Sequence, residues 1–138
     1  RPELRGTLSR IGAFCYGVRS ADGPELDGIR PVATLTASVV DVVDGDAVVA
    51  IGSFDGIPST LAGVAVGTPQ GARELRSIDH TRSVVAGWPG AAVGDVVRVF
   101  GAGEWGESSA TTLAERIDTV GEEILTRLTA RVRRVVAD

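Results

Sequence analysis

Lysine, asparagine and methionine are absent from the 138 residues, and cysteine and histidine occur once each. Without lysine, these residues cannot form a Schiff base, attach pyridoxal phosphate or supply the lysine of a phosphate-binding loop. The single cysteine, Cys15, excludes an internal disulfide, and together with His80 it provides too few ligands for a structural zinc site. We therefore expect no metal and no cofactor.

Excess positive charge and long apolar runs are missing as well. The net charge is −4 and the pI is about 5.0, and the only dense basic cluster is Arg131, Arg133 and Arg134. This balance predicts no nucleic-acid partner. No stretch approaches the roughly 20 apolar residues of a membrane span, and residues 1–5 lack the apolar run of a signal peptide. We expect a cytoplasmic protein without a membrane partner, and the lack of residues with A-rich codons indicates a high-GC bacterium.

Aromatic residues make up only 4% of the chain, while 43% of the residues are hydrophobic and 23% are charged. These proportions are typical of a globular protein whose core is built from Val, Leu, Ile and Ala. We find no internal repeat, low-complexity linker or shift in composition. Residues 1–138 are therefore expected to form a single globular domain.

The first half of the chain carries strand patterns. Residues 6–19 alternate in the manner of a strand covered on both faces, and residues 20–31 read as a surface loop. Two β-branched runs, 32–43 and 47–54, flank Asp44-Gly45. An Asp-Gly pair between such runs predicts a β-hairpin, because glycine supplies the positive φ of a tight turn.

The middle of the chain is expected to form a strand at 61–66 and then a short helix. Thr68-Pro69 resembles a helix start, since threonine caps free amides and proline fits the first helical position. Leu75 and Ile78 have the spacing of a buried helical face ending near His80. Residues 83–88 and 95–100 then read as two strands of a second hairpin.

The C-terminal part has helical periodicity from about Ser109. Thr112 and Glu115 have the spacing of a capping box, and the apolar positions fall on one stripe: Leu113, Ile117, Val120, Ile124, Leu128, Val132 and Val135. The fold class expected is α+β, a mostly antiparallel sheet of about six strands with one short helix and one long C-terminal amphipathic helix packed on it.

A glycine-rich stretch, Gly101-Ala-Gly103-Glu-Trp105-Gly106, matches the G-x-G-x-x-G pattern between a predicted strand and a predicted helix. No second strand follows the helix, and Glu104 and Glu107 place negative charge where a pyrophosphate would bind. A plain strand-to-helix turn is therefore the favoured interpretation. Binding of a small anion through Gly101, Gly103, Trp105 and Gly106 is retained as the weaker hypothesis.

The candidates for catalysis are His80, Asp79 and Cys15, with Arg82 as a group that could bind an anionic ligand. Each has an ordinary alternative interpretation. A single histidine at a helix end is more often a surface or capping residue, and Cys15 in an alternating strand favours a buried, inert thiol. Asp79 is adjacent to His80 in sequence but does not automatically orient its ring.

No complete catalytic constellation is present, and this absence favours a non-catalytic ligand-binding or self-assembling, homo-oligomeric domain. Self-association and a small anionic ligand are the partners expected. The alternative is a small metal-independent hydrolase, lyase or isomerase that uses His80 with Asp79 or Cys15 on an anionic small molecule. Convergence of His80, Arg82 and Cys15 in one pocket would favour that alternative.

Overall fold

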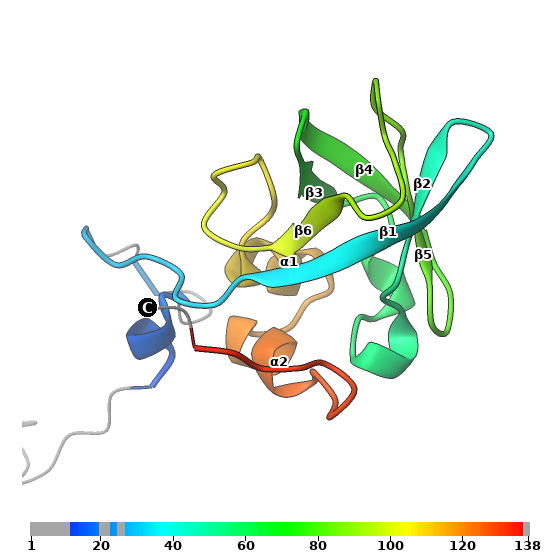
Figure 1. Cartoon of the computed structure of the whole chain (residues 1–138). Helices are drawn as coiled ribbons and strands as arrows, with labels where there is room; N and C mark the ends of the chain where they lie inside the picture. The colour runs from blue at the N-terminus through cyan, green and yellow to red at the C-terminus, as the bar shows by residue number, and fades with distance from the viewer. Residues whose placement is uncertain (1–11, 20–22, 25–26, 137–138) are drawn as a thin grey trace, which may run out of the picture.

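The computed structural model describes residues 12–19, 23–24 and 27–136. Its central feature is a closed barrel in which every neighbouring pair of strands is antiparallel, in the order β1-β2-β5-β4-β3-β6 (Figure 1). The strands are β1 (Leu35–Val43), β2 (Asp46–Val49), β3 (Ala65–Thr68), β4 (Gly71–Ile78), β5 (Ser83–Val85) and β6 (Val96–Phe100). The predicted sheet with helices packed on one face is therefore wrong, because the sheet closes on itself.

The β1–β2 hairpin is the prediction that the structure confirms most directly. Asp44 and Gly45 have φ values of 50° and 87°, and Val43 pairs with Asp46 across a two-residue turn. Positive φ at both central residues matches the right-handed twist of the flanking strands. Side chains on β1 alternate between buried and exposed from Leu35 to Val40, so one side of the hairpin faces the barrel interior.

A second hairpin, β3–β4, stands where the sequence predicted a short helix, so that prediction is wrong. Thr68 pairs with Gly71, and its hydroxyl donates to the carbonyl of Gly71 and accepts the N–H of Gln70. Thr68-Pro69 therefore opens a turn and not a helix. The segment that follows is extended because β3 and β5 satisfy its backbone on both edges.

The predicted strands at 83–88 and 95–100 exist in shortened form, but they do not pair with each other. β5 lies between β2 and β4, and β6 lies between β1 and β3. Closure of the barrel thus gives β6 two partners distant in sequence, whereas β5 pairs with the distant β2 and with β4, which directly precedes it. Of the predicted strand at 6–19, residues 6–11 lie outside the described part, and Ala13–Tyr16 form a 3₁₀ turn, named η2, in place of a strand.

The predicted long C-terminal helix is also wrong, since two short helices replace it. These are α1 (Ala110–Arg116) and α2 (Gly121–Thr126), separated by Asp118 with a φ of 55°. Ser109 caps α1 by accepting the N–H of Thr112, so the cap lies three residues before the predicted one. The break lets both pieces bury apolar residues, and Leu113 and Ile124 are almost fully buried.

The barrel interior and the two helices share one apolar core. Figure 1 shows α1 and α2 below the barrel, and the largest buried side chains come from both parts of the fold: Phe100, Ile57, Leu61, Leu75, Leu113 and Ile124. None of the helices in the described residues is long and apolar enough to cross a membrane.

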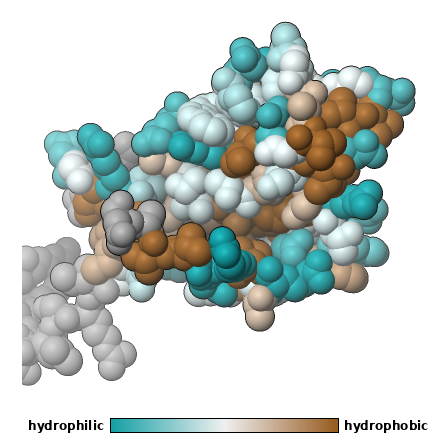
Figure 2. Space-filling view, viewed as in Figure 1, coloured by the Kyte–Doolittle hydropathy of each residue, from teal (hydrophilic) through white to brown (hydrophobic). Residues whose placement is uncertain are grey.

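The outer face of the barrel carries an apolar row across four neighbouring strands. Val96 on β6, Val40 on β1, Val48 on β2 and Val84 on β5 point outward, and we name them the valine row. Val48 pairs directly with Val84, and Ser38 pairs with Val96. Figure 2 shows hydrophobic residues gathered over the region where β1 and β2 meet. Val40 and Val96 are exposed, and Val48 and Val84 are partly buried.

Candidate functional site

A cavity of about 860 Å³ lies between the barrel and the C-terminal segment. Its walls come from residues around the start of β1, from the stretch after β2, and from the chain that follows α2. The polar members of the lining are Tyr16, Thr34, Thr36, Asp55, Arg131, Arg133 and Arg134. The remainder is mostly aliphatic, including Leu35, Ile51, Phe100, Leu128 and Val132.

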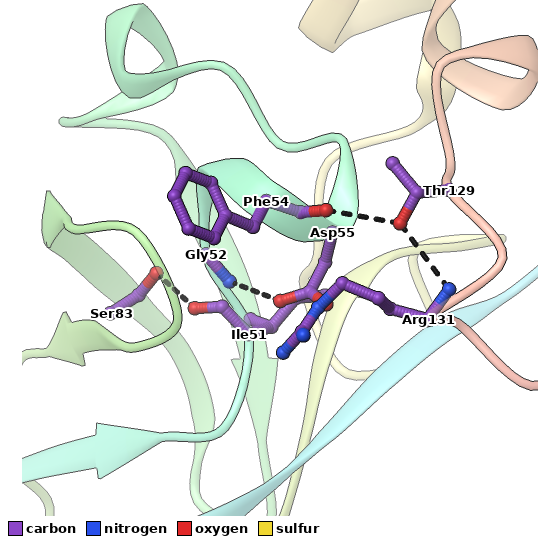
Figure 3. Close-up of polar contacts among 7 residues, drawn as sticks. All are labelled: Ile51, Gly52, Phe54, Asp55, Ser83, Thr129 and Arg131. Atoms are coloured by element: carbon purple, nitrogen blue, oxygen red, sulfur yellow. Dashed lines mark hydrogen bonds and ion pairs between the residues drawn. The ribbon is translucent and has the colours of Figure 1, made fainter.

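The turn after β2 places a buried carboxylate at this cavity. Ser53–Asp55 form a 3₁₀ turn, named η3, flanked by Gly52 and Gly56, and Asp55 is only 6% exposed. The N–H of Gly52 donates to Asp55 Oδ2 at 2.9 Å (Figure 3). The turn is fixed to the barrel because the N–H groups of Ser53 and Phe54 donate to the carbonyls of residues 79 and 80, each at 2.8 Å.

The C-terminal segment docks on the same turn. The N–H of Thr129 donates to the carbonyl of Asp55 at 3.1 Å, and its hydroxyl donates to the carbonyl of Phe54 at 3.0 Å. Arg131 Nε then donates to Asp55 Oδ1 at 2.9 Å, which makes an ion pair. Figure 3 shows the Arg131 side chain reaching back from the C-terminal segment to this carboxylate.

Close backbone approach makes this docking possible at Gly56. Its φ is 103°, a conformation that side chains disfavour. A Cβ at this position would lie 2.2 Å from the carbonyl oxygen of Arg127. Glycine is therefore required both by the turn and by the segment that packs on it.

The cavity carries a positive charge. Among the described residues of its lining there are three arginines and one carboxylate, Asp55, which is already paired with Arg131. A positive, mostly apolar cavity suits a small anionic or zwitterionic ligand.

Tyr16 contributes a phenol to this cavity. It ends η2, where Gly17 follows in the left-handed conformation, and its carbonyl accepts the N–H of Val32 at 3.2 Å. The residue is 56% exposed. Tyr16 thus has an anchored backbone and lines the cavity without being buried.

The predicted catalytic residues lie elsewhere. His80 stacks on the ring of Phe54, with centroids 4.8 Å apart and an interplanar angle of 8°. Asp79 Oδ1 accepts the backbone N–H of His80 at 2.7 Å, so this oxygen does not orient the imidazole. In Figure 3 the Phe54 ring lies on the side of the turn opposite to Thr129.

Cys15 and Arg82 are exposed side chains, and the expected buried thiol is therefore not observed. The cavity lining includes neither of them, nor Asp79 or His80. Asp79 and Arg82 share a turn in which the N–H of Asp79 donates to the carbonyl of Arg82. His80 therefore lies in the same turn as Asp79 and Arg82. The structure does not bring these residues together with Cys15 at the cavity.

The glycine-rich loop at 101–106 is filled by the protein's own carboxylate. The side chain of Glu107 is 0% exposed, and it accepts the N–H groups of Gly103 and Trp105 at 3.0 and 2.8 Å. Arg98 Nη1 lies 3.6 Å from Glu107 Oε1. Glu107 thus occupies the amides that an external anion would need, which opposes the ligand hypothesis for this loop.

Arg98 completes the loop from the barrel side. Its guanidinium lies 4.2 Å from the centre of the Trp105 ring and donates to Glu104 at 2.6 Å. Burial alone would raise the pKa of Glu107, but hydrogen bonds from backbone N–H groups, aided by the charge of Arg98, lower this pKa below its ordinary value of 4.5. The loop is therefore stabilised by the ionised form of Glu107.

Replacing Glu107 with glutamine is expected to lower the free energy of unfolding at neutral pH by about 3 kcal/mol, because an amide cannot accept both N–H groups. The pKa of Glu107 is lowered by folding, so its contribution is present above pH 4.5 and is lost as the pH falls through the folded value. Urea unfolding at about pH 7 and about pH 3 measures both effects. The exposed neighbour Glu104→Gln is the control, with an expected change within about 1 kcal/mol, and equal losses in the two variants would contradict the assignment.

The residues that define the cavity were not predicted as site residues. Tyr16 fell within a predicted strand, and Arg131 was noted only as a member of the basic cluster with Arg133 and Arg134. The one local signal for Asp55 is its place in a short polar turn between Gly52 and Gly56. In the ranges 12–19, 23–24 and 27–136, no group of three or more histidine, cysteine, aspartate or glutamate side chains is placed to hold a metal.

Comparison with known proteins identifies the family. A family model described as "Alanine racemase, C-terminal domain" matches residues 44–136. The chain is 32% identical to an alanine racemase of Thermobifida fusca over an alignment that covers 98% of the chain and 42% of the relative. An alanine racemase of Frankia casuarinae is 31% identical, with 96% of the chain and 41% of the relative covered.

Solved structures of alanine racemases also resemble this chain. Alanine racemase from a D-cycloserine-producing Streptomyces lavendulae matches with a TM-score of 0.71 and 30% identity, covering 85% of this chain and 37% of that one. The biosynthetic alanine racemase of Pseudomonas aeruginosa matches with a TM-score of 0.74 and 27% identity, covering 92% and 41%. The structure from Oenococcus oeni, at 22% identity and a TM-score of 0.85, covers 99% of this chain and 41% of that one and supports the fold alone.

The chain spans about two fifths of the length of the curated relatives it matches. These relatives are bacterial, as predicted, and all carry the name of an enzyme. The predicted non-catalytic ligand-binding or self-assembling role is therefore wrong, because the family match points to a domain of a racemase. The chain belongs to the alanine racemase C-terminal domain family.

Proposed function

We propose that this chain serves as the C-terminal domain of an amino-acid racemase that interconverts L- and D-alanine. Support comes from the family match over residues 44–136 and from relatives named alanine racemase. The observation that carries the proposal within the structure is that the exposed residue Tyr16 lines a cavity to which three arginines also contribute.

Racemisation requires removal of the proton on Cα and delivery of a proton to the opposite face. A side chain that removes or delivers this proton must therefore lie within hydrogen-bond reach of the hydrogen on Cα. In the described cavity lining, Tyr16 and Asp55 are the groups able to lose a proton, and both oxygens of Asp55 accept hydrogen bonds from Gly52 and Arg131. We assign proton transfer from this domain to the Tyr16 hydroxyl.

The remaining chemistry must come from outside these residues. An amino acid becomes acidic at Cα when its amine forms an imine that withdraws electrons, and enzymes commonly attach such a group to a lysine. This chain has no lysine. The proposal therefore makes this domain a contributor of proton transfer and ligand contacts to a larger enzyme.

A domain exchange tests the proposed function. The matching region of the Thermobifida fusca alanine racemase is replaced by this chain, and conversion of L-alanine to D-alanine is followed by chiral chromatography. We expect the chimera to racemise alanine, whereas the same relative truncated before this region does not. A folded chimera with no activity above that of the truncated control would contradict the proposal.

Self-association through the valine row is proposed as the assembly mode, with a second copy as the partner. Val40 and Val96 are 38% and 40% exposed and are continuous with Val48 and Val84 on neighbouring strands. Exposed apolar patches on soluble proteins commonly mark such contacts. Cytoplasmic location and binding of a small anionic molecule, both expected from the sequence, stay proposals.

Light scattering tests self-association. We expect a mass of about 28 kDa, twice the 14.2 kDa of one chain, and a shift toward one chain when Val40 and Val96 are both changed to lysine. The control is Glu74→Lys on β4, an exposed position outside the valine row. A mass of one chain at high protein concentration, or an unchanged dimer in the double variant, would overturn this assembly mode.

A further inference from the structure

The barrel closes where β3 meets β6, and we name this contact, in which Gly67 lies opposite Arg98, the β3–β6 junction. Gly67 with Arg98 is the one register pair of these two described strands, whereas each other neighbouring pair in the barrel has three or four. Ser108, which follows β6 along the chain, adds contacts across the junction, because its N–H and its hydroxyl donate to the carbonyl of Ala65 at 3.1 and 3.0 Å. Little backbone pairing therefore closes the barrel here.

The carboxylate of Glu107 lies between the two sides of this junction. A Cβ on Gly67 would lie 2.8 Å from Glu107 Oε2, and a Cβ on Gly101, the residue after β6, would lie 2.6 Å from Oε1. Neither of these two described glycines has a positive φ, so the requirement for glycine there is one of space. Glu107 thus fills the room that two missing side chains leave, one on each side of the junction.

Both oxygens of this carboxylate are held by groups that follow or belong to β6. The N–H of Gly103 donates to Glu107 Oε1 at 3.0 Å, and the N–H of Trp105 donates to Oε2 at 2.8 Å. Arg98 Nη1 lies 3.6 Å from Oε1, and Arg98 is also the residue that pairs with Gly67. The register pair and the carboxylate therefore form one connected unit.

A proton on Glu107 would disrupt this unit. Both of its oxygens face N–H donors, so a hydroxyl at either oxygen would place a donor opposite a donor. Among the described residues, the charged groups around the carboxylate are Arg98 from β6 and, paired with Arg98, Glu104 from the loop, whereas β3 contributes the uncharged Gly67.

The ionised form of Glu107 is the form present at neutral pH. Burial raises the pKa of this carboxyl, but the backbone N–H donors and the charge of Arg98 outweigh burial and lower the pKa below its ordinary value of 4.5. Because folding lowers the pKa, the contribution of the charge is present above pH 4.5 and is lost as the pH falls through the folded value.

We propose that the barrel opens at the β3–β6 junction and that the ionised Glu107 side chain keeps this junction closed. When the charge is lost, β3 and β6 separate while the other strands stay paired, because each of those contacts has at least three register pairs. Local opening is expected at the part of a fold that is held by the fewest contacts. This inference goes beyond the proposed function and does not depend on it, since it concerns a conformational change within this domain.

Hydrogen exchange and cross-strand nuclear Overhauser effects in the full 138-residue chain test the proposal between about pH 6 and about pH 3. The amides of Gly103 and Trp105 report on the carboxylate. The amide of Ser108 and the Overhauser effect between Gly67 and Arg98 report on the junction. On acidification we expect protection of the Ser108 amide to fall by about 10-fold or more relative to amides of the β1–β2 hairpin, and the Overhauser effect to weaken.

The reporters distinguish opening of the junction from other effects of acid. Loss of protection at Gly103 and Trp105 alone would show that the loop is released while the strands stay paired, and it would overturn the proposal. An equal loss in the β1–β2 hairpin would indicate global unfolding and would overturn it as well. So would unchanged protection of Ser108 at about pH 3.

Glu107→Gln removes the charge at every pH. At about pH 6 we expect this variant to show the open pattern that the unchanged chain shows at about pH 3, with little further change on acidification. The control is Glu104→Gln, since Glu104 also pairs with Arg98 but has a side chain that is 67% exposed, and it should keep the closed pattern. A closed junction in Glu107→Gln would contradict the proposal. Should this variant fail to fold, the pH series of the unchanged chain decides alone.

Discussion

Replacing Tyr16 with phenylalanine is expected to lower kcat for alanine racemisation in the chimera by about 10²- to 10⁴-fold, the usual contribution of a side chain that transfers a proton. The change removes one oxygen and leaves the ring that lines the cavity. The backbone contact between Tyr16 and Val32 does not involve the hydroxyl, so η2 should be preserved. Rates are measured by chiral chromatography in both directions.

Cys15→Ser is the matched control for this prediction. Cys15 precedes Tyr16 in the same turn but does not line the cavity. We expect its effect on kcat to be small beside that of Tyr16→Phe. If both variants lost the same fraction of activity, disturbance of η2 would explain the result, and if neither lost any, proton transfer could not be assigned to Tyr16.

The largest expected effect on stability comes from Gly56→Ala. The new Cβ would lie 2.2 Å from the carbonyl oxygen of Arg127 in a residue with a φ of 103°. The three nearest atoms, which belong to Arg127 and Leu128, are all backbone atoms, so the backbone must move. We expect a loss of about 4 kcal/mol or more in the free energy of unfolding, measured by urea denaturation.

Gly45→Ala separates the two causes of this loss. Gly45 has a φ of 87°, yet nothing lies within 4 Å of the position of a Cβ. Its replacement should cost only the left-handed conformation, about 1 to 2 kcal/mol. A loss at Gly56 no larger than that at Gly45 would show that the C-terminal segment is not tightly docked on η3.

Local signals explain what could be predicted of the fold. Asp44-Gly45 specifies its hairpin without help from distant residues, because both positions must take positive φ. Thr68-Pro69 is compatible with a helix start and with a turn. Pairing of β4 with β3 and β5, its two neighbours along the chain, decides between them.

The apolar pattern of the C-terminal part likewise predicted the structure only in part. The spacing of Leu113 and Ile124 correctly indicates burial on helical segments. It does not reveal that Asp118 takes a positive φ and divides the pattern into two helices. The two short helices bury Leu113 and Ile124, whereas Val120 and Val135 of the predicted stripe are 41% and 71% exposed.

The candidate site could not be assembled from sequence because its members are distant. Arg131 and Asp55 are separated by 76 positions, and no motif links them. His80 and Cys15 were predicted as site residues because of their chemistry and because each residue type occurs once. The residues at the cavity are of common types, and only their positions in the fold distinguish them. Burial of Asp55 is the decisive property, and it follows from how the turn packs on the barrel.

Closure of the barrel also bears on how the domain behaves outside the native state. An open sheet ends in two strands with unpaired amides, which can recruit strands from other molecules and seed aggregation. Here β6 closes the circle, but it pairs with β3 through a single register pair, Gly67 with Arg98. By its register this is the shortest strand pairing in the barrel, and separation of β3 from β6 would expose two strand edges at once. The resistance of the domain to aggregation therefore depends on the few residues that keep β3 and β6 paired.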